Sequence, residues 1–390
     1  MTAQPSGRLG HLLILLPSTR FGGTEGHTLQ LAARLAAQPG LRVTLAAEAA
    51  LLPELAAGLP HGPAPALRAA PIGWSGRVPT EAEIAGQQAA ATALVARLAP
   101  DILLIPLPWP NAGLGLLRAG AALPRLVVLH LVPEAAPAGL AEAVEDLPLE
   151  GAAWCAVSAP GARRAERFFG LPPLACAQID NPAPPPPQAD RAMVRAALRA
   201  GLGLHADAPL VLFVGRLEKG KGAHLLPGIA TESGMTLACA GSGPLRPLLD
   251  RQAAADPEGR LRLLGQLADP AAWYLAADAL VLPSVLEGMP LVFLEAAAAG
   301  CPVVATEAAL EGLGAAAPDL ARLVPRPEAA PFAATLRALL ADPEGAAALA
   351  GRARAEAARR SWDRILPEWL GLLRAAATRR PLDPSPETPA

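Results

Sequence analysis

Two cationic side chains in the second half of the chain have the types and spacing that suit a phosphorylated ligand. Arg216 and Lys221 stand five positions apart in the segment VGRLEKGKG, where glycines let the backbone turn and approach a ligand closely. Arginine offers a planar fork of donors and lysine a compact charge, so together they fit a diphosphate. Taken alone, the pair is equally consistent with two solvated surface cations.

Two glutamates follow about 65 residues later in the segment SVLEGMPLVFLEA. Glu287 precedes an expected helix and Glu295 falls in its second turn. A carboxylate in an apolar run is costly to bury without polar partners, and the two hydroxyls of a ribose would supply them. A helix that starts after Pro290 also presents free N–H groups and a positive dipole end to an anion. The alternative is that Glu295 only favours the helix N-terminus electrostatically.

A third segment, Gly241-Ser242-Gly243-Pro244, ends another apolar run. A strand that ends in Gly-x-Gly before a proline is structurally ordinary. In this position it would let a flat nucleotide base lie against the backbone.

The elements that must position these residues follow from the alternation of short apolar runs with helix-length segments, which is typical of parallel βαβ units. The expected strands of the first half are His11–Leu16, Arg42–Ala46, Ile102–Ile105, Leu126–Leu129 and Ala153–Val157. Those of the second half are Leu210–Val214, Thr236–Ala240, Leu261–Leu264, Ala279–Leu282 and Pro302–Ala305. The expected helices are Thr28–Ala37, Glu81–Leu98, Leu245–Ala254, Pro270–Ala277, Leu291–Ala299 and most of Pro331–Ala377. The chain is therefore predicted to be α/β, with two doubly wound Rossmann-like halves.

The proline-rich stretch Asn181–Pro187 separates these halves, because consecutive prolines cannot join a helix or a central strand. The predicted parts are an N-terminal Rossmann-like domain (1–183), a linker with a connecting helix (184–208), a C-terminal Rossmann-like domain (209–360), a closing helix (361–378) and a disordered tail (379–390).

Unusual residues stand just after the predicted strands in both halves. Gly22 and Gly23 follow the first strand, Trp109 follows the Ile102 strand, and His130 ends the Leu126 strand. Arg216, Gly241 and Glu287 do the same in the second half. Because open parallel sheets bind ligands beyond the carboxyl ends of their strands, we expect both sets to line one cleft between the domains.

The composition excludes several classes of protein. The chain has 390 residues, 52% of them hydrophobic and 17% charged, as in a folded globular protein. A net charge of −2 gives no electrostatic case for nucleic acid. Four cysteines without a C-x-x-C pair indicate a reducing compartment. The sequence contains no uninterrupted run of about 18 apolar residues, so no membrane span is predicted. We expect a cytoplasmic protein.

The chain resembles the retaining glycosyltransferases of family four, the group 1 glycosyltransferases, which have the GT-B fold of two Rossmann-like domains facing across a cleft. The resemblance rests on Val214-Gly215-Arg216-Leu217 with Lys221-Gly222, Gly241-Ser242-Gly243-Pro244, Glu287-Gly288 with Leu291 and Glu295, and Gly300-Cys301-Pro302-Val303-Val304-Ala305-Thr306. Gly22-Gly23-Thr24-Glu25-Gly26-His27, Ile179-Asp180-Asn181-Pro182 and Ser361-Trp362 extend it to nearly the whole chain.

The resemblance implies a role for each matching residue. Arg216 and Lys221 would neutralise the donor diphosphate, Glu295 would hold the ribose, Glu287 would contact the sugar, and His130 would lie near the transferred sugar. A hydrogen-bonded core histidine is the alternative for His130. The backbone around the donor would be formed by Gly23, Gly215, Gly241, Gly243, Gly288, Met289 and Leu291.

The implied activity is transfer of a hexosyl or N-acetylhexosaminyl unit from a nucleotide-diphosphate sugar, UDP favoured over GDP, with retention of anomeric configuration, in glycan biosynthesis. No cofactor is expected. The sequence has no D-x-D motif for a divalent metal, while Arg216 and Lys221 could stabilise the leaving diphosphate, so metal-independent transfer is predicted. The chain departs from the family where Gly288-Met289-Pro290 replaces Gly-aromatic-Gly. Pro290 lacks an N–H but suits the first position of a helix.

The acceptor is the least determined part of the interpretation. Trp74, Arg77 and Trp109 stand on predicted loops of the first half and are candidates for acceptor contacts. A glycan or a lipid-linked acceptor fits, and the latter would bring the protein to the inner face of the membrane as a peripheral protein. A nucleotide-sugar epimerase of related fold and a catalytically idle nucleotide-sugar-binding subunit remain as alternatives.

Overall fold

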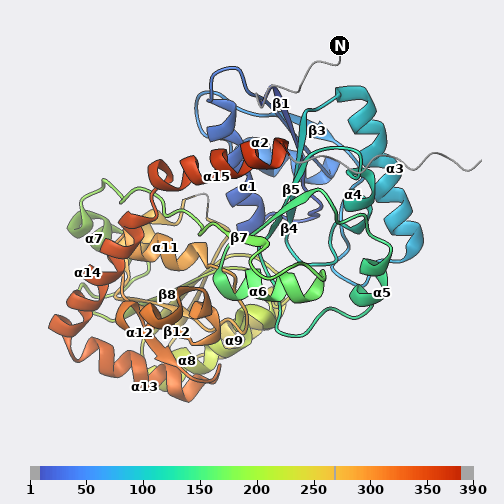
Figure 1. Ribbon diagram of the computed structural model, residues 1–390. Coiled ribbons are helices and arrows are strands. Elements are labelled where there is room, and N and C mark those ends of the chain that lie inside the picture. The colour runs from blue at the N-terminus through green and yellow to red at the C-terminus, as the bar shows by residue number, and fades with distance from the viewer. Residues whose placement is uncertain (1–8, 268, 379–390) are drawn as a thin grey trace, which may run out of the picture. The chain divides into compact units, whose positions relative to one another are not determined.

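The computed structural model describes residues 9–267 and 269–378 (Figure 1). The described chain divides into two compact units, one with residues 9–180 and 365–378 and the other with residues 181–267 and 269–364. The predicted disordered tail, 379–390, lies outside the described residues. None of the described helices is both long enough and apolar enough to cross a bilayer.

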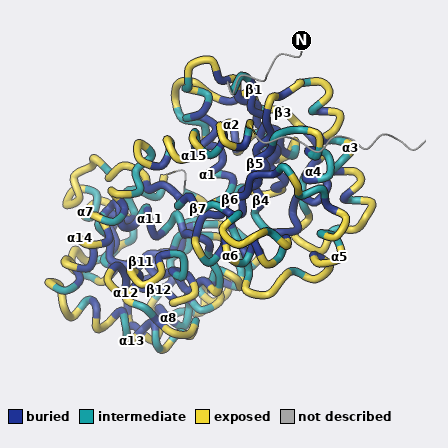
Figure 2. Tube along the Cα trace, in the orientation of Figure 1, coloured by how far each residue is buried: buried dark blue, intermediate teal, exposed yellow. Residues whose placement is uncertain are grey.

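The first unit contains a parallel sheet of seven strands in the order β3-β2-β1-β4-β5-β6-β7. The strands are β1 (His11–Leu15), β2 (Arg42–Ala47), β3 (Ala66–Ala69), β4 (Ile102–Leu107), β5 (Arg125–Leu129), β6 (Ala152–Ala156) and β7 (Cys176–Gln178). Every residue of β1, β4 and β5 is buried, as expected of central strands covered by helices on both faces, and Figure 2 shows these strands in dark blue.

The helices of the first unit cover both faces of its sheet, with α3, α4 and α5 on one side and α1 and α15 on the other (Figure 1). They are α1 (Gly23–Ala36), α2 (Leu52–Ala57), α3 (Glu81–Leu98), α4 (Leu114–Ala119), α5 (Leu140–Glu145) and α6 (Ala159–Phe168). The last helix, α15 (Trp362–Ala377), belongs to this unit from Ile365 onward.

The second unit repeats this plan with a parallel sheet of six strands in the order β10-β9-β8-β11-β12-β13. The strands are β8 (Leu210–Val214), β9 (Thr236–Ala240), β10 (Leu261–Gly265), β11 (Ala279–Leu282), β12 (Val303–Thr306) and β13 (Arg322–Val324). Its helices are α7 (Arg191–Gly201), α8 (Leu226–Ser233), α9 (Arg246–Ala255), α10 (Ala271–Ala276), α11 (Leu291–Ala298), α12 (Ala317–Leu320), α13 (Ala329–Leu340) and α14 (Pro343–Arg359). Both halves are doubly wound, as predicted.

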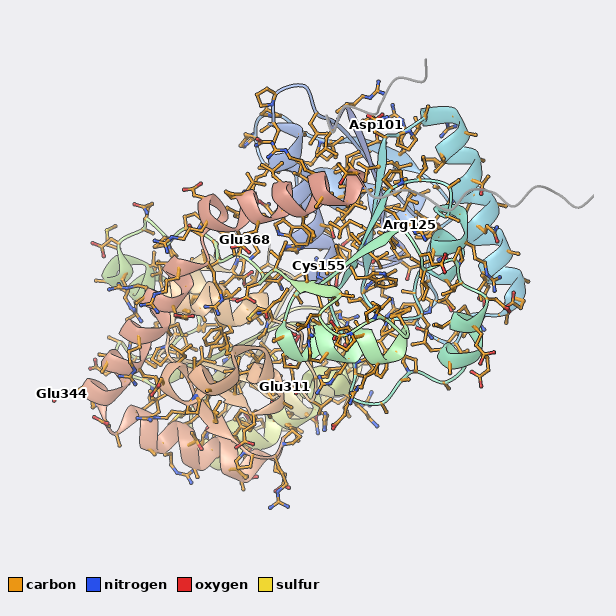
Figure 3. All side chains as sticks on the ribbon, in the orientation of Figure 1. Asp101, Arg125, Cys155, Glu311, Glu344 and Glu368 are labelled. Atoms are coloured by element: carbon orange, nitrogen blue, oxygen red, sulfur yellow. The ribbon has the colours of Figure 1, made fainter. Side chains whose placement is uncertain are left out.

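A buried arginine stabilises the first sheet at the start of β5. Arg125 has no exposed surface, and its guanidinium donates to carbonyl oxygens of Gly120, Ala121, Pro148 and Glu150 (labelled in Figure 3). Burial lowers the pKa of Arg125 to about 10, so the side chain stays charged at neutral pH. Its hydrogen bonds tie two loops to the strand, because a buried cation requires such partners.

Several elements differ from the prediction. The edge strands β3, β7 and β13 were not predicted, because each has only three or four residues and, apart from Cys176 and Val324, little of it is buried. Helix α1 starts at Gly23 rather than at Thr28, so Gly23 and Glu25 lie in its first turn and not in a loop. A glycine at the N-cap, here Gly22, is compatible with this start.

Candidate functional site

The strand order of the second unit explains why its distant motifs meet. Strand β8 pairs with β9 on one side and with β11 on the other, so the direction in which successive strands are added to the sheet reverses between β8 and β11. Ligands of doubly wound sheets bind beyond the carboxyl ends of the strands at such a switch point. The loop that follows β8 carries Arg216 and Lys221, and the loop that follows β11 carries Glu287.

These two loops are in direct contact. The N–H of Val285 donates to the carbonyl of Gly220 at 3.0 Å, and Lys221 Nζ lies 2.6 Å from Glu287 Oε1. Gly222 has a φ of +71°, and a Cβ there would stand 2.2 Å from the carbonyl oxygen of Pro283. The left-handed conformation and the close approach both require glycine at this position.

Arg216 forms the second ion pair of the loop, with Glu218 at 2.9 Å, and its side chain is 44% exposed. Each cation is therefore matched by a carboxylate, Lys221 by the nearly buried Glu287 and Arg216 by the more accessible Glu218. An entering diphosphate would compete with these carboxylates for both cations. Among the described residues, no cluster of three or more His, Cys, Asp and Glu side chains could hold a metal ion.

The glycines after β9 serve contact between loops. A Cβ on Gly241, whose φ is +135°, would stand 1.9 Å from the carbonyl oxygen of Gly215, and one on Gly243 would stand 2.7 Å from the backbone of Leu217. The N–H of Leu217 donates to the carbonyl of Ser242 at 2.8 Å. The space beside these glycines is thus filled by the loop that carries Arg216, which they hold in place.

The start of α11 lies beside Glu287. Pro290 occupies the N-cap of the helix, which starts directly after it as expected, so its missing N–H removes nothing from the helix. The N–H groups of Leu291 and Val292 have no partner within the helix and remain for an anion. The backbone before them is tied down by Asn181, whose Nδ2 donates to the carbonyl of Met289 at 2.7 Å. Gly288 lies between Glu287 and this anchored position.

Glu295 lies in the second turn of α11 and has a partner that the sequence did not reveal. The hydroxyl of Tyr274, on α10, donates to Glu295 Oε2 at 2.6 Å, and Tyr274 is 1% exposed. Burial raises the pKa of Glu295, the Tyr274 hydrogen bond opposes this rise, and the charge of Asp269 adds to it. Ionisation of the Glu295 carboxylate is therefore made costly by burial, and the hydrogen bond from the Tyr274 hydroxyl stabilises the ionised form.

The predicted residues of the first unit all follow its parallel strands. Gly23 begins α1 just after β1, and the N-cap Gly22 provides no capping side chain, which leaves the first N–H groups without a side-chain acceptor from that residue. Glu25 in the first turn accepts a hydrogen bond from Ser18. The switch point of this sheet lies between β1 and β4, so Gly23 and Trp109 follow the two strands that define it.

His130 follows β5 and is buried against a second histidine. Its ring lies edge to face with that of His27 at a centroid distance of 5.1 Å, and Trp369 on α15 lies 5.7 Å from His27. Burial and then the charge of His27 hold the pKa of His130 well below its usual value. Within the described part of the chain, His130 Nε2 has no hydrogen-bond partner. The ring is therefore neutral at physiological pH, and it retains unused hydrogen-bonding capacity.

The acceptor candidates are engaged in local structure. Trp74 Nε1 donates to the carbonyl of Arg77 at 2.7 Å, and Arg77 pairs with Glu83 at 2.8 Å. Trp109 follows β4, where its carbonyl accepts from the N–H of Ala112 at 3.0 Å. Trp74 and Arg77 follow β3 and Trp109 follows β4, so all three precede helices at the carboxyl ends of the strands.

The structure places Arg216 and Lys221 on the loop after β8, and Lys221 pairs with Glu287 on the loop that leads into α11. It places Gly23, His130 and the three acceptor candidates on the first unit. Sequence reasoning missed the partners of these residues, namely Glu218, Tyr274, His27 and the Asn181 side chain. His27 and Asn181 stood in segments that carry the resemblance, while the only signal for Tyr274 was that it is the single tyrosine of the chain.

Comparisons with known proteins agree with this geometry. Residues 208–342 match the family described as glycosyl transferases group 1. A D-inositol 3-phosphate glycosyltransferase of Xylanimonas cellulosilytica is 36% identical over 230 residues, which are 55% of this chain and 53% of that protein. One from Thermobispora bispora is 36% identical over 185 residues, 43% of each chain. The chain spans about half the length of the curated relatives it matches.

Solved structures show the same fold along nearly the whole chain. The crystal structure of Anabaena HepE in complex with UDP has a TM-score of 0.73 at 21% identity and covers 94% of this chain and 100% of its own. Sucrose-phosphate synthase from Thermosynechococcus elongatus has a TM-score of 0.69 at 22% identity and covers 94% of this chain and 98% of its own. The two doubly wound sheets therefore define a GT-B fold. Residues 208–342 match the group 1 glycosyltransferases, in agreement with the resemblance seen in the sequence.

Proposed function

We propose that the protein transfers a sugar from a nucleotide-diphosphate sugar to a hydroxylated acceptor, with retention of configuration and without a metal ion. The observation that carries the proposal is the contact, at the switch point of the second sheet, between the loop of Arg216 and Lys221 and the Glu287 loop that leads into α11. Anabaena HepE, which shares the fold, was crystallised with UDP and with UDP-glucose. UDP is accordingly the nucleotide that we favour.

The proposed chemistry follows from where charge develops. As the glycosidic bond breaks, negative charge grows on the diphosphate oxygens, and fixed cations there stabilise the transition state more than the ground state. Arg216 and Lys221 would take this role after they exchange Glu218 and Glu287 for phosphate. Glu287, released from Lys221, would then be free to accept hydrogen bonds from the sugar.

The remaining residues keep the roles that the resemblance implies for them. The N–H groups at the start of α11 would complete the phosphate site, and the neutral His130 would offer a hydrogen-bonding nitrogen to the transferred sugar. The departing phosphate would accept the proton of the acceptor hydroxyl on the face from which it leaves, so that the acceptor oxygen bonds to the anomeric carbon on that same face and the configuration is retained. Trp74, Arg77 and Trp109 are the proposed acceptor contacts. The curated relatives are named for D-inositol 3-phosphate, so this polyol is the first acceptor to test.

The donor site is tested by thermal unfolding with UDP, GDP, ADP and TDP, in the presence of EDTA. A nucleotide at about 100 times its dissociation constant stabilises the folded protein by roughly 2.7 kcal/mol. We expect UDP to stabilise the wild type and Arg216→Ala to lose most of the effect. Arg326→Ala is the matched control, because Arg326 belongs to the same unit, is 79% exposed and pairs only weakly with Glu328 at 3.6 Å. An equal UDP shift in all three proteins would contradict the proposed role of Arg216.

Transfer itself is tested by incubation with UDP-glucose and D-inositol 3-phosphate, followed by NMR of the product. A new glycoside with the anomeric configuration of the donor supports a retaining transferase. An epimerised nucleotide sugar would instead support the epimerase alternative, which the match to the group 1 glycosyltransferases does not favour.

A further inference from the structure

Tyr274 belongs to none of the sequence motifs, yet its side chain is hydrogen-bonded to Glu295, the carboxylate predicted to hold the ribose. It lies on α10, buried to 1% exposure, and its hydroxyl donates to Glu295 Oε2 at 2.6 Å. This distance is typical of a hydrogen bond to an ionised acceptor. Among the described residues, no other hydrogen bond or ion pair reaches the Glu295 carboxylate.

We propose that Tyr274 is a positioning residue that orients Glu295 toward a ribose diol, so that the donor site selects ribonucleotides over 2′-deoxyribonucleotides. The inference rests on the proposed function, because it assigns the nucleotide to this carboxylate. Tyr274 would not touch the ligand and would act only through Glu295.

The argument starts from the capacity of the carboxylate. An ionised glutamate is an acceptor only, with two oxygens and about four lone-pair sites. Tyr274 occupies one of these sites on Oε2, which fixes the rotamer of Glu295 and leaves Oε1 and the second Oε2 site open. Two vicinal hydroxyls that both donate would satisfy what remains. A single hydroxyl would leave an acceptor of a partly buried carboxylate without a partner, which is costly.

The charges around the pair keep the phenol a donor and the carboxylate an acceptor. Burial, with the charge of Glu295, raises the pKa of Tyr274 well above its usual value, so the phenol keeps its proton throughout the physiological range. Burial and Asp269 raise the pKa of Glu295, while the Tyr274 hydrogen bond lowers it. Loss of the phenol would free the rotamer and also favour the protonated acid, which accepts less well from a diol.

The alternative is that Tyr274 only fills the space beneath α11. The two roles predict different ligand dependence. A space-filling residue affects UDP and 2′-deoxy-UDP alike, because both present the same base and diphosphate. A positioning residue affects only the ligand that carries both hydroxyls. The ratio of the two affinities therefore separates the roles, whatever the absolute affinity of a variant.

Calorimetric titrations of the full-length protein with UDP and with 2′-deoxy-UDP test the inference. We expect the wild type to prefer UDP by about 10-fold or more, since one hydrogen bond to a charged group is at stake. Tyr274→Phe should reduce this preference to within about 3-fold, chiefly through weaker UDP binding. Trp273→Phe, on the same helix and without a bond to Glu295, should retain the wild-type ratio.

Each other outcome has a distinct meaning. If the wild type binds both nucleotides equally, or if Tyr274→Phe weakens both and keeps their ratio, the positioning role is wrong and the donor site stands. If neither nucleotide binds the wild type, the proposed function fails, and this inference fails with it. The wild-type comparison alone decides whether the nucleotide binds and whether the diol is selected, and the ratio measured on Tyr274→Phe decides the role of Tyr274.

Discussion

The buried histidine pair of the first unit predicts a specific loss of stability in acid. Burial lowers the pKa of His27 from 6.5 to about 4. Below pH 6.5 the His27 imidazole is protonated in the unfolded chain, whereas in the folded chain it is protonated only below about pH 4. The unfolded state therefore binds more protons over this range, and the free energy of unfolding falls as the pH falls.

The magnitude follows from the two pKa values. With a pKa of 6.5 in the unfolded state and of about 4 in the folded state, His27 lowers the free energy of unfolding at pH 5 by about 2 kcal/mol. At pH 7 nearly all of this loss disappears, because His27 is then mostly neutral in both states. His27→Gln removes this titration and keeps hydrogen-bonding groups at the position. The variant is expected to lose about 2 kcal/mol less than the wild type between pH 7 and pH 5, whatever its stability at pH 7.

Urea unfolding at pH 7, 6 and 5, followed by tryptophan fluorescence, measures this difference. Trp369 lies 5.7 Å from His27 and reports on the first unit. His205→Asn is the matched control, because His205 is 84% exposed and should leave the pH dependence unchanged. A His27→Gln variant that loses as much stability in acid as the wild type would refute the reasoning, since the acid loss would then come from other groups.

Two further predictions concern the loops of the second unit. Glu218→Gln removes a competitor of phosphate for Arg216, so UDP should bind up to about 5-fold more tightly in calorimetry, the range expected from breaking an exposed ion pair. Unchanged or weaker binding would contradict that competition. Gly241→Ala should lower the melting temperature sharply, because its Cβ would overlap the carbonyl oxygen of Gly215 in a left-handed backbone. Gly351→Ala, in α14 with nothing within 4 Å of its Cβ, should raise it slightly.

The central parallel strands could be predicted from the local sequence alone. Leu210–Val214, Thr236–Ala240 and Ala279–Leu282 form strands with the predicted bounds, because each is a short apolar run buried on both faces and bounded by polar or turn residues. The edge strands β3, β7 and β13 could not be predicted in this way. In β3 the residues are exposed or half-buried, so its existence depends on pairing with β2, which no local pattern encodes.

The candidate site was predictable in its members but not in their pairing. Lys221 and Glu287 were both identified from residue type and position after a strand, yet nothing in the sequence indicated that they form an ion pair at 2.6 Å. The same holds for Tyr274 and Glu295, which lie on different helices. Side-chain pairing depends on how helices pack on a sheet, and sequence spacing does not report it. The start of α11 was predicted correctly at Leu291, directly after Pro290.

Strand order is the physical link between the scattered motifs and one site. In a doubly wound sheet the chain first builds outward on one side of its first strand and then crosses to build on the other. Strand β11 therefore pairs with β8 although β9 and β10 come between them in sequence, and the loops after β8 and β11 become neighbours. The first unit repeats this with β1 and β4. In the second unit this order brings Lys221 and Glu287 together, 66 positions apart in the sequence, so a motif search confined to short spacings would find only one of the two loops.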